Sequence, residues 1–81
     1  MKEAEIRDLV RRMFIEVLGV KEEDFSFEKV GEDIDEWDSL SHMTLVSELE
    51  NDLGISMEIE EISEMDSVEN VVKVLKRKVG S

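Results

Sequence analysis

The residues with the most chemistry to offer in this 81-residue chain stand together, since Asp38, Ser39 and His42 fall within five positions. Their types are those of a hydrolytic triad, in which a histidine takes the proton of a serine and a carboxylate orients the histidine. Such a site also needs an oxyanion hole and a substrate cleft. We expect neither, because this stretch is typical of an exposed helix start and so short a chain hardly encloses a deep cavity. The pattern predicts no catalytic residue, and we interpret His42 as a half-exposed surface residue.

A metal site is the second chemistry to weigh. Asp33 and Asp35 are spaced like the first two ligands of a calcium-binding EF-hand loop. The match then fails, because Trp37 occupies the fifth position, Asp38 replaces the glycine at the sixth and Thr44 replaces the glutamate at the twelfth. The chain has no cysteine, which excludes a thiolate site. We predict no metal centre, and only weak divalent-ion binding by a crowded acidic surface stays open.

A serine at the N-terminus of a helix can also serve as a point of covalent attachment. Its Oγ would face solvent beside backbone N–H groups that have no partner inside the helix. A phosphodiester on that oxygen would lie at the positive end of the helix dipole, and another enzyme would supply the base. The simpler interpretation is that Asp38 and Ser39 only cap the helix, and the local pattern by itself favours it.

The helix that would present Ser39 spans residues 38–53. Asp38 and Ser39 stand where an N-cap belongs, and Gly54 follows the last apolar residue, as a glycine often does at a helix C-terminus. Trp37 is interpreted as packing under the preceding loop. Apolar residues recur at helical steps of three and four, at Leu40, Met43, Val46, Leu49 and Leu53.

Three further helices are predicted. Residues 3–18 form one, ended by Gly19, and a short one lies around residues 60–64 with Ile62 and Met65 turned inward. Asp66 or Ser67 caps the last, and Asp66 and Glu69 have the spacing of a capping box. The first stripe comprises Ile6, Leu9, Val10, Met13, Phe14, Val17 and Leu18, with Ile15 beside it. The last stripe comprises Val68, Val71, Val72, Leu75 and Val79.

Residues 20–37 break the helical period and predict a long ordered loop, in which a short strand would have no second strand to pair with. Its apolar anchors are Phe25, Phe27, Val30, Ile34 and Trp37. We therefore expect a single all-α domain over residues 1–81. Its fold would be a small antiparallel four-helix bundle, with three longer helices and one short helix, and the long loop between helices one and two.

Charge is unevenly distributed along the chain, whose formal net charge is −12. Residues 22–69 hold 18 acidic residues and a single base, Lys29, a net charge of −17, and the remaining residues carry +5. Nucleic acid is therefore not an expected partner, whereas basic protein surfaces are. An acidic face that is merely solvated explains the charge equally well. Without a cysteine, a signal peptide or an apolar run long enough to span a membrane, we expect a cytoplasmic protein, and a monomer.

At the Asp38-Ser39-Leu40 triplet the chain resembles the acyl carrier protein family, the carriers of a phosphopantetheine arm, whose attachment motif this is. The resemblance continues through Leu45-Val46, Leu49-Glu50 and Leu53-Gly54-Ile55 to the helix of residues 68–75, and so covers essentially the whole chain. With Trp37 before the triplet, the motif is similar to that of discrete carriers outside the main fatty-acid line. The uncharged residues Ser41, Thr44 and Asn51 also depart from fatty-acid carriers, where acids are frequent.

The resemblance implies that Ser39 receives 4′-phosphopantetheine from coenzyme A through a separate phosphopantetheinyl transferase. The arm's thiol would carry an acyl or aminoacyl group for fatty acid, polyketide or peptide-type biosynthesis. The face that the transferase and the loading and condensing enzymes recognise would comprise Asp38, Leu40, Met43, Ser47 and Glu48, although Leu40 and Met43 suit an ordinary core equally well. A bound fatty chain would pass Val46, Leu49, Ile62, Met65 and Val71. The alternative function is an acidic helical interaction domain without a prosthetic group.

Overall fold

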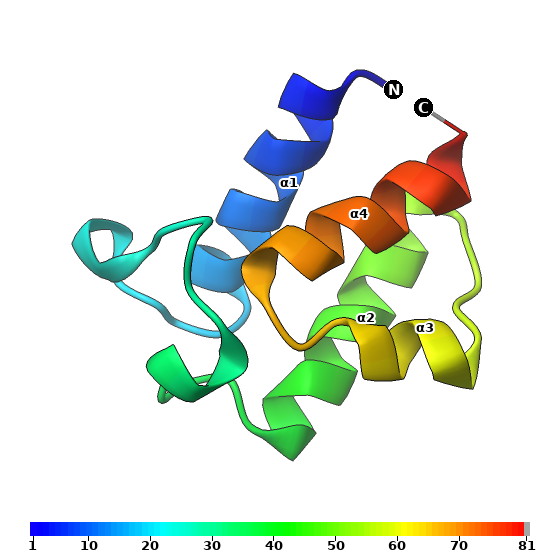
Figure 1. The fold of residues 1–81 in the computed structure, drawn as a ribbon. Coiled ribbons are helices and arrows are strands. Elements are labelled where there is room, and N and C mark those ends of the chain that lie inside the picture. The colour runs from blue at the N-terminus through cyan, green and yellow to red at the C-terminus, as the bar shows by residue number, and fades with distance from the viewer. Residues whose placement is uncertain (81) are drawn as a thin grey trace.

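Four helices, joined by one long and two short connections, make up the fold (Figure 1). The computed structural model describes residues 1–80. The helices are α1 (Glu3–Glu16), α2 (Ser39–Leu53), α3 (Ile59–Glu64) and α4 (Val68–Val79). The prediction of an all-α bundle with three longer helices and one short helix is confirmed. The N-terminus lies near the end of α4 (Figure 1).

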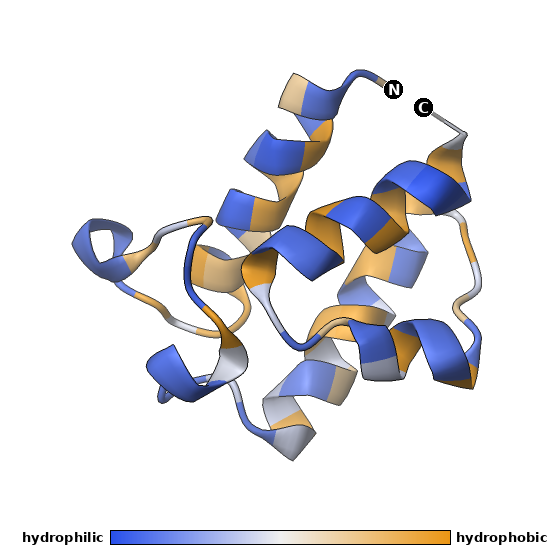
Figure 2. Ribbon diagram, viewed as in Figure 1, coloured by the Kyte–Doolittle hydropathy of each residue, from blue (hydrophilic) through white to orange (hydrophobic). Residues whose placement is uncertain are grey.

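The core forms where the apolar faces of the helices meet. Helix α1 contacts both α4 and α2, and α3 packs on α4; Figure 2 shows apolar residues recurring along one side of α1 and of α4. Most residues of the two stripes predicted for α1 and α4 are buried: Ile6, Leu9, Val10, Met13, Phe14, Leu18, Val68, Val71, Val72 and Leu75. Val17, Val79 and, as expected, Ile15 are half-buried. Burial contributes about 1.5–3 kcal/mol for each large aliphatic side chain, which offsets the low helix propensity of the valine-rich α4.

The buried face of α2 differs from the predicted stripe in its first turn. Leu45, Val46 and Leu49 are buried, whereas Leu40 is 79% exposed and Met43 is 50% exposed. Leu40 and Met43 lie off the buried face of α2, which continues from Leu49 through Leu45 to the half-buried His42. The open question about Leu40 and Met43 is therefore answered in favour of the surface.

The connection between α1 and α2 is ordered by two short 3₁₀ turns, Glu22–Asp24 and Gly31–Asp33, and by aromatic packing. Among the predicted anchors, Ile34 is buried, and the aromatic residues Phe25, Phe27 and Trp37 are half-buried against the core. The ring of Phe14 on α1 lies 5.7 Å from that of Phe25 and 4.9 Å, edge to face, from that of Trp37. Edge-to-face contacts of this kind are favourable, and they fix the loop that precedes α2.

Val30 is not an anchor, and that prediction is wrong, because its side chain is 43% exposed. Val30 instead forms an isolated antiparallel bridge with Ser67, and backbone hydrogen bonds of 2.9 and 3.0 Å flank it. A Cβ atom on Gly31 would meet the carbonyl oxygen of Asp66 at 3.3 Å, so the close approach favours glycine. The loop thus does pair, with the connection between α3 and α4, although residues 1–80 contain no regular strand.

Ser67 is the residue that caps α4. Its Oγ accepts a hydrogen bond from the Asn70 N–H at 3.1 Å, and Asp66 accepts one from the Asn70 side chain at 2.8 Å. The capping box suggested by the spacing of Asp66 and Glu69 is not formed, because the Glu69 carboxylate is bound by Arg7 instead.

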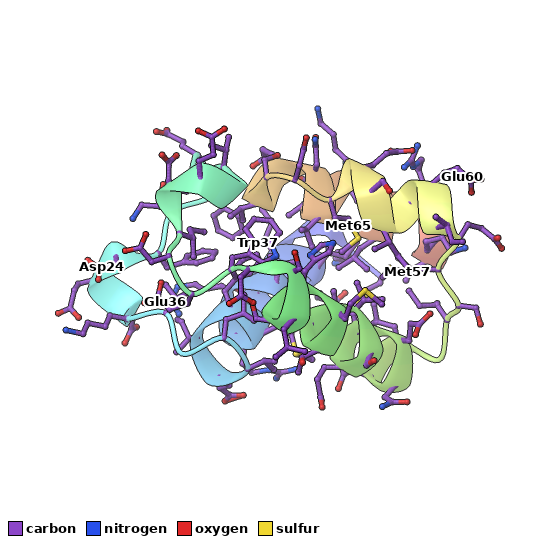
Figure 3. The ribbon with its side chains drawn as sticks, turned by 90° about the horizontal axis from the view of Figure 1, so that it is seen from below. Asp24, Glu36, Trp37, Met57, Glu60 and Met65 are labelled. Carbon is purple, nitrogen blue, oxygen red and sulfur yellow. The ribbon has the colours of Figure 1, made fainter. Side chains whose placement is uncertain are left out.

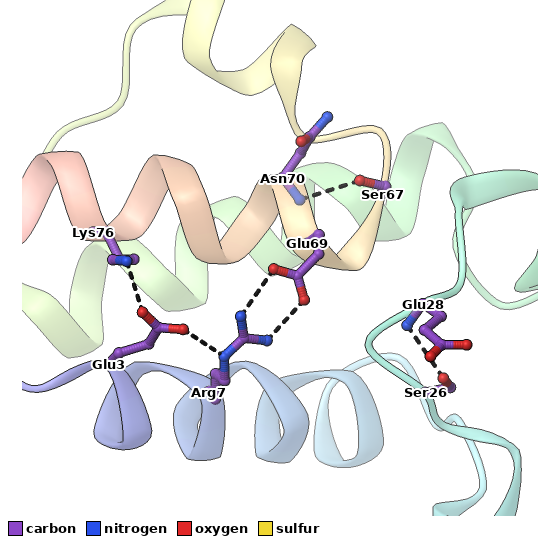
Figure 4. Close-up of polar contacts among 8 residues, drawn as sticks. All are labelled: Glu3, Arg7, Ser26, Glu28, Ser67, Glu69, Asn70 and Lys76. Carbon is purple, nitrogen blue, oxygen red and sulfur yellow. Dashed lines mark hydrogen bonds and ion pairs between the residues drawn. The ribbon is translucent and has the colours of Figure 1, made fainter.

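Arg7 joins the two helices that form most of the core (Figure 4). Its guanidinium donates two hydrogen bonds of 2.7 and 2.9 Å to Glu69 of α4 and one of 2.9 Å to Glu3. Lys76 of α4 donates to the other oxygen of Glu3 at 2.7 Å. The same guanidinium lies 5.0 Å above the centre of the Phe27 ring. One half-buried side chain therefore connects α1, α4 and the long loop.

We expect Arg7→Ala to lower the free energy of unfolding by about 1 kcal/mol, because it removes a two-pronged charged hydrogen bond and a cation–π contact, both partly screened by solvent. In a chain of this size that is a fall in Tm of about 4–8 °C. Arg12→Ala is the matched control, since Arg12 approaches Asp52 only at 3.9 Å on the surface; its effect should be below about 2 °C. Equal losses in thermal unfolding of the two variants would contradict a special role for Arg7.

The Arg7 contribution should also depend on pH. The Arg7 hydrogen bond lowers the pKa of Glu69, and hydrogen bonds from Lys76 and then Arg7 lower the pKa of Glu3. A carboxyl with a depressed pKa contributes stability above its unfolded pKa and loses it as pH falls through the folded pKa. The Tm difference between wild type and Arg7→Ala should thus be full at pH 7 and begin to fall near pH 4.3, where unperturbed glutamate titrates. It should be lost only below the lowered folded pKa values of Glu3 and Glu69. A difference that persists undiminished at pH 2.5 would show that Arg7 acts through packing alone.

Candidate functional site

Helix α2 begins with a reciprocal pair of hydrogen bonds between Asp38 and Ser41. Asp38 Oδ1 accepts from the Ser41 N–H, and Ser41 Oγ accepts from the Asp38 N–H, each at 2.8 Å. The Ser41 hydroxyl also donates to the carbonyl oxygen of Glu36 at 2.7 Å. The backbone bond from Ser41 is the main cause that holds the pKa of the Asp38 carboxyl below its ordinary value. Asp38 is therefore the N-cap of α2, and Ser41 completes a capping box.

Because Asp38 and Ser41 satisfy the cap between them, Ser39 is left as the first residue of the helix. Its side chain is exposed, and no hydrogen bond among residues 1–80 involves its Oγ. The backbone N–H groups of Ser39 and Leu40 belong to the first turn and have no carbonyl partner within the helix. The hydroxyl thus stands at the positive end of the α2 dipole. The interpretation of both residues as caps holds for Asp38 alone.

The five residues expected on a partner face, Asp38, Leu40, Met43, Ser47 and Glu48, are all exposed on α2 or at its N-cap. Ile59, the first residue of α3, is 79% exposed as well and adds a third apolar side chain to the surface of these helices. The sequence pattern did not predict the exposure of Ile59, because Ile59, Ile62 and Met65 are spaced three residues apart and the last two were expected to point inward. Ile59 is exposed although it shares this spacing, and it is the first residue of the helix.

A shallow groove of about 940 Å³ begins at Ser39 and continues between the start of α2, the turn Gly31–Asp33 and the connection from α3 to α4. Trp37 and His42 line it near Ser39, and Ile62 and Met65 line it farther along. Figure 3 shows Trp37 and Met65 among the side chains between the helices, and Glu60 at the periphery. The other residues expected along a bound fatty chain, Val46, Leu49 and Val71, are buried in the core and do not line this groove.

His42 lies half-buried, as expected, but it is more firmly held than a surface residue. Its Nδ1 accepts a hydrogen bond from the Trp37 indole Nε1–H at 2.8 Å, and its Nε2 lies 3.0 Å from the carbonyl oxygen of Ile62. With both ring nitrogens engaged, His42 does not serve Ser39 as a base, and no triad forms. The sequence did contain a signal for the burial of His42. On the buried face of α2, residues recur at helical steps from Leu49 through Val46 and Leu45, and the next position on that face is His42 and not Met43.

Residues 1–80 hold no group of three or more His, Cys, Asp or Glu side chains that could bind a metal ion. Over the same residues, no helix has the length and hydrophobicity needed to cross a bilayer.

Comparison with known proteins matches the sequence of this chain to a family. The model of the family described as "Phosphopantetheine attachment site" matches residues 8–75, from within α1 into α4. An acyl carrier protein of Petrotoga mobilis (strain DSM 10674 / SJ95) is 28% identical over 80 residues, which cover 99% of this chain and 94% of that relative. Both matches include the serine at the start of α2 and parts of all four helices.

Because Asp38 caps α2 and the Ser39 hydroxyl makes no hydrogen bond, substitutions of the two residues should differ in their effect on stability. Asp38→Ala should lower Tm by about 4–8 °C, because it removes an N-cap worth about one hydrogen bond, whereas Asp38→Asn, which keeps an acceptor, should lower it much less. Ser39→Ala is the matched control and should leave Tm within about 2 °C of wild type, because no bond to the hydroxyl is lost. A large loss for Ser39→Ala in thermal unfolding would show that Ser39 takes part in the cap.

Proposed function

The chain belongs to the phosphopantetheine-attachment family of acyl carrier proteins, and on this premise we propose that Ser39 carries a 4′-phosphopantetheine arm. The protein would act as a carrier that delivers bound intermediates to partner enzymes and would catalyse no reaction itself. The observation that supports this best is the Ser39 hydroxyl: it is exposed, free of hydrogen bonds among residues 1–80 and located at the first position of α2.

The surroundings of Ser39 suit a phosphodiester. The N–H groups of Ser39 and Leu40 in the first turn offer donors to phosphate oxygens, and the helix dipole favours the negative charge. Loading forms a bond between Ser39 Oγ and a phosphorus of coenzyme A and releases the adenosine bisphosphate portion; the transferase takes the hydroxyl proton. When attached, the arm supplies a terminal thiol that holds an acyl or aminoacyl group as a thioester. Asp38 keeps the hydroxyl free by capping the helix in its place.

Partner enzymes would bind the face of α2 next to Ser39. The exposed apolar side chains Leu40 and Met43 would make the central contacts, and Ser47 and Glu48 would lie at the edge. Since residues 22–69 carry a net charge of −17, the partners, including the phosphopantetheinyl transferase, would present basic surfaces. Apolar contacts surrounded by charge are typical of transient interfaces, in which charge speeds association.

The lining of the groove beside Ser39 bears on the cargo that the arm would carry. The groove at Ser39 offers Ile62 and Met65 to an apolar group, and methionine adapts readily to different shapes. This suits short acyl or aminoacyl groups of fatty acid, polyketide or peptide-type biosynthesis. The protein would work as a monomer in the cytoplasm, a reducing compartment that suits a chain without cysteine. An acidic interaction domain without an arm is the second candidate, supported by the same charge.

Incubation with coenzyme A, Mg²⁺ and a broad-specificity phosphopantetheinyl transferase should add one arm to the wild-type protein, measured as intact mass. Ser39→Ala should abolish the addition, because the receiving oxygen is lost. Ser47→Ala, which removes another exposed serine of the same helix, should load as wild type does. Failure of the wild type to load would favour the interaction domain, and loading of Ser39→Ala would assign the arm to another residue.

A further inference from the structure

Helix α3 is joined to α2 at both of its ends by a polar side chain of α2. Before α3 begins, the Glu50 carboxylate accepts a hydrogen bond from the Met57 N–H at 2.8 Å. Near the end of α3, His42 Nε2 lies 3.0 Å from the Ile62 carbonyl oxygen. A helix of six residues has little stability of its own, so these contacts and its packing on α4 determine where it lies.

The two partners of His42 fix the state of its ring. An indole N–H is only a donor, so the Nδ1 that accepts it at 2.8 Å carries no proton. A carbonyl oxygen is only an acceptor, so Nε2 carries the ring proton and donates it to Ile62. The arrangement therefore requires a neutral imidazole with the proton on Nε2, and it places the ring at the Ser39 end of the groove.

The bonded series Trp37–His42–Ile62 connects three parts of the fold. Trp37 is held edge to face on Phe14 of α1, with ring centres 4.9 Å apart, so the donor has a fixed position. The His42 ring lies 5.7 Å from the Trp37 ring. These hydrogen bonds therefore connect the end of α3, through His42 and Trp37, to Phe14 in the core of α1. Trp37, His42 and Ile62 all line the groove that includes Ser39.

We propose that His42 is a positioning residue that holds α3 beside Ser39, and that a second proton on its ring releases α3. That proton would sit on Nδ1 and face the Trp37 N–H, so that two donors oppose each other and the ring leaves its place, and the Ile62 bond is lost with it. Imidazoles change charge between about pH 5 and 8. Three acidic residues line the same groove as His42 and come from three elements: Glu32 from the turn Gly31–Asp33, Asp38 from the start of α2, and Asp66 from the α3–α4 connection. The two ring nitrogens of His42 face Trp37 and Ile62, so none of these acids pairs with the ring in the present arrangement.

The consequence for Ser39 rests on the proposed function: with α3 released, the wall of the groove moves and the arm and its cargo lose a fixed surface. The position of α3 itself can be measured without the arm. Trp37 and His42 are the sole tryptophan and the sole histidine of the chain, so their signals need no assignment by mutation.

The test is nuclear magnetic resonance on the apo protein between pH 8 and pH 5, with hydrogen exchange of the α3 amides. At pH 8 the ¹⁵N shifts of His42 should show the proton on Nε2. On acidification the Trp37 indole N–H signal and the α3 amides should respond with one midpoint, and α3 opening should increase by about tenfold, as expected for one lost hydrogen bond. A proton on Nδ1 at pH 8, or α3 amides that ignore the titration, would overturn the proposal.

Two variants separate positioning from mere packing. His42→Gln keeps a donor for the Ile62 carbonyl and cannot titrate, so its α3 should stay protected at both pH values, whereas His42→Leu should open α3 about tenfold at pH 8 as well. Trp37→Phe keeps a ring on Phe14 but removes the opposing donor, so its His42 should charge without releasing α3. Should His42→Leu fail to fold, the pH response of wild type against Trp37→Phe still decides, since equal responses contradict the mechanism. Loading of Ser39 is measured separately, so either proposal can fail without the other.

Discussion

The first turn of α2 depends on one exchange of hydrogen bonds, that between Asp38 and Ser41. A helix start has N–H groups that need acceptors, and serine is among the residues that usually supply one. Here Asp38 and Ser41 supply the bonds, and Ser39 between them supplies none. The site thus combines an ordered backbone with an unused hydroxyl, which a carrier requires: its serine must be accessible to another enzyme but fixed in place.

The rest of the bundle holds α2 in position while leaving one side of it free. Aliphatic residues of α1, α2 and α4 form the core, and the Arg7 contacts with Glu3 and Glu69 join α1 to α4 on the side away from Ser39. Three of the four basic residues of α4 are used within the fold, since Lys76, Arg77 and Lys78 pair with acids of α1 and α3. Most of the acidic excess is left without such partners and belongs to the surface that would meet basic enzymes.

Helix α3 is the least independent element of the fold. Six residues do not sustain a helix alone, and its outward residue Ile59 contributes nothing to the core. Ion pairs to α4 and the two contacts from Glu50 and His42 hold it against the bundle. Ile62 and the buried Met65 at its end are its main apolar contacts with the core, and an element with so few of them opens at a smaller cost in free energy than a helix with a full apolar face. It is also the helix that forms part of the groove beside Ser39.

The sequence by itself determined the four helices, the long loop, the family and Ser39 as the candidate attachment residue, because apolar spacing, glycines at helix ends and the Asp38-Ser39-Leu40 triplet are local signals. Tertiary structure alone decided that Leu40, Met43 and Ile59 lie outside, that Val30 pairs with Ser67, and that His42 joins Trp37 to Ile62. Helical spacing tells which residues share a face but not where the core ends, and a hydrogen bond across 20 positions of sequence leaves no periodic trace.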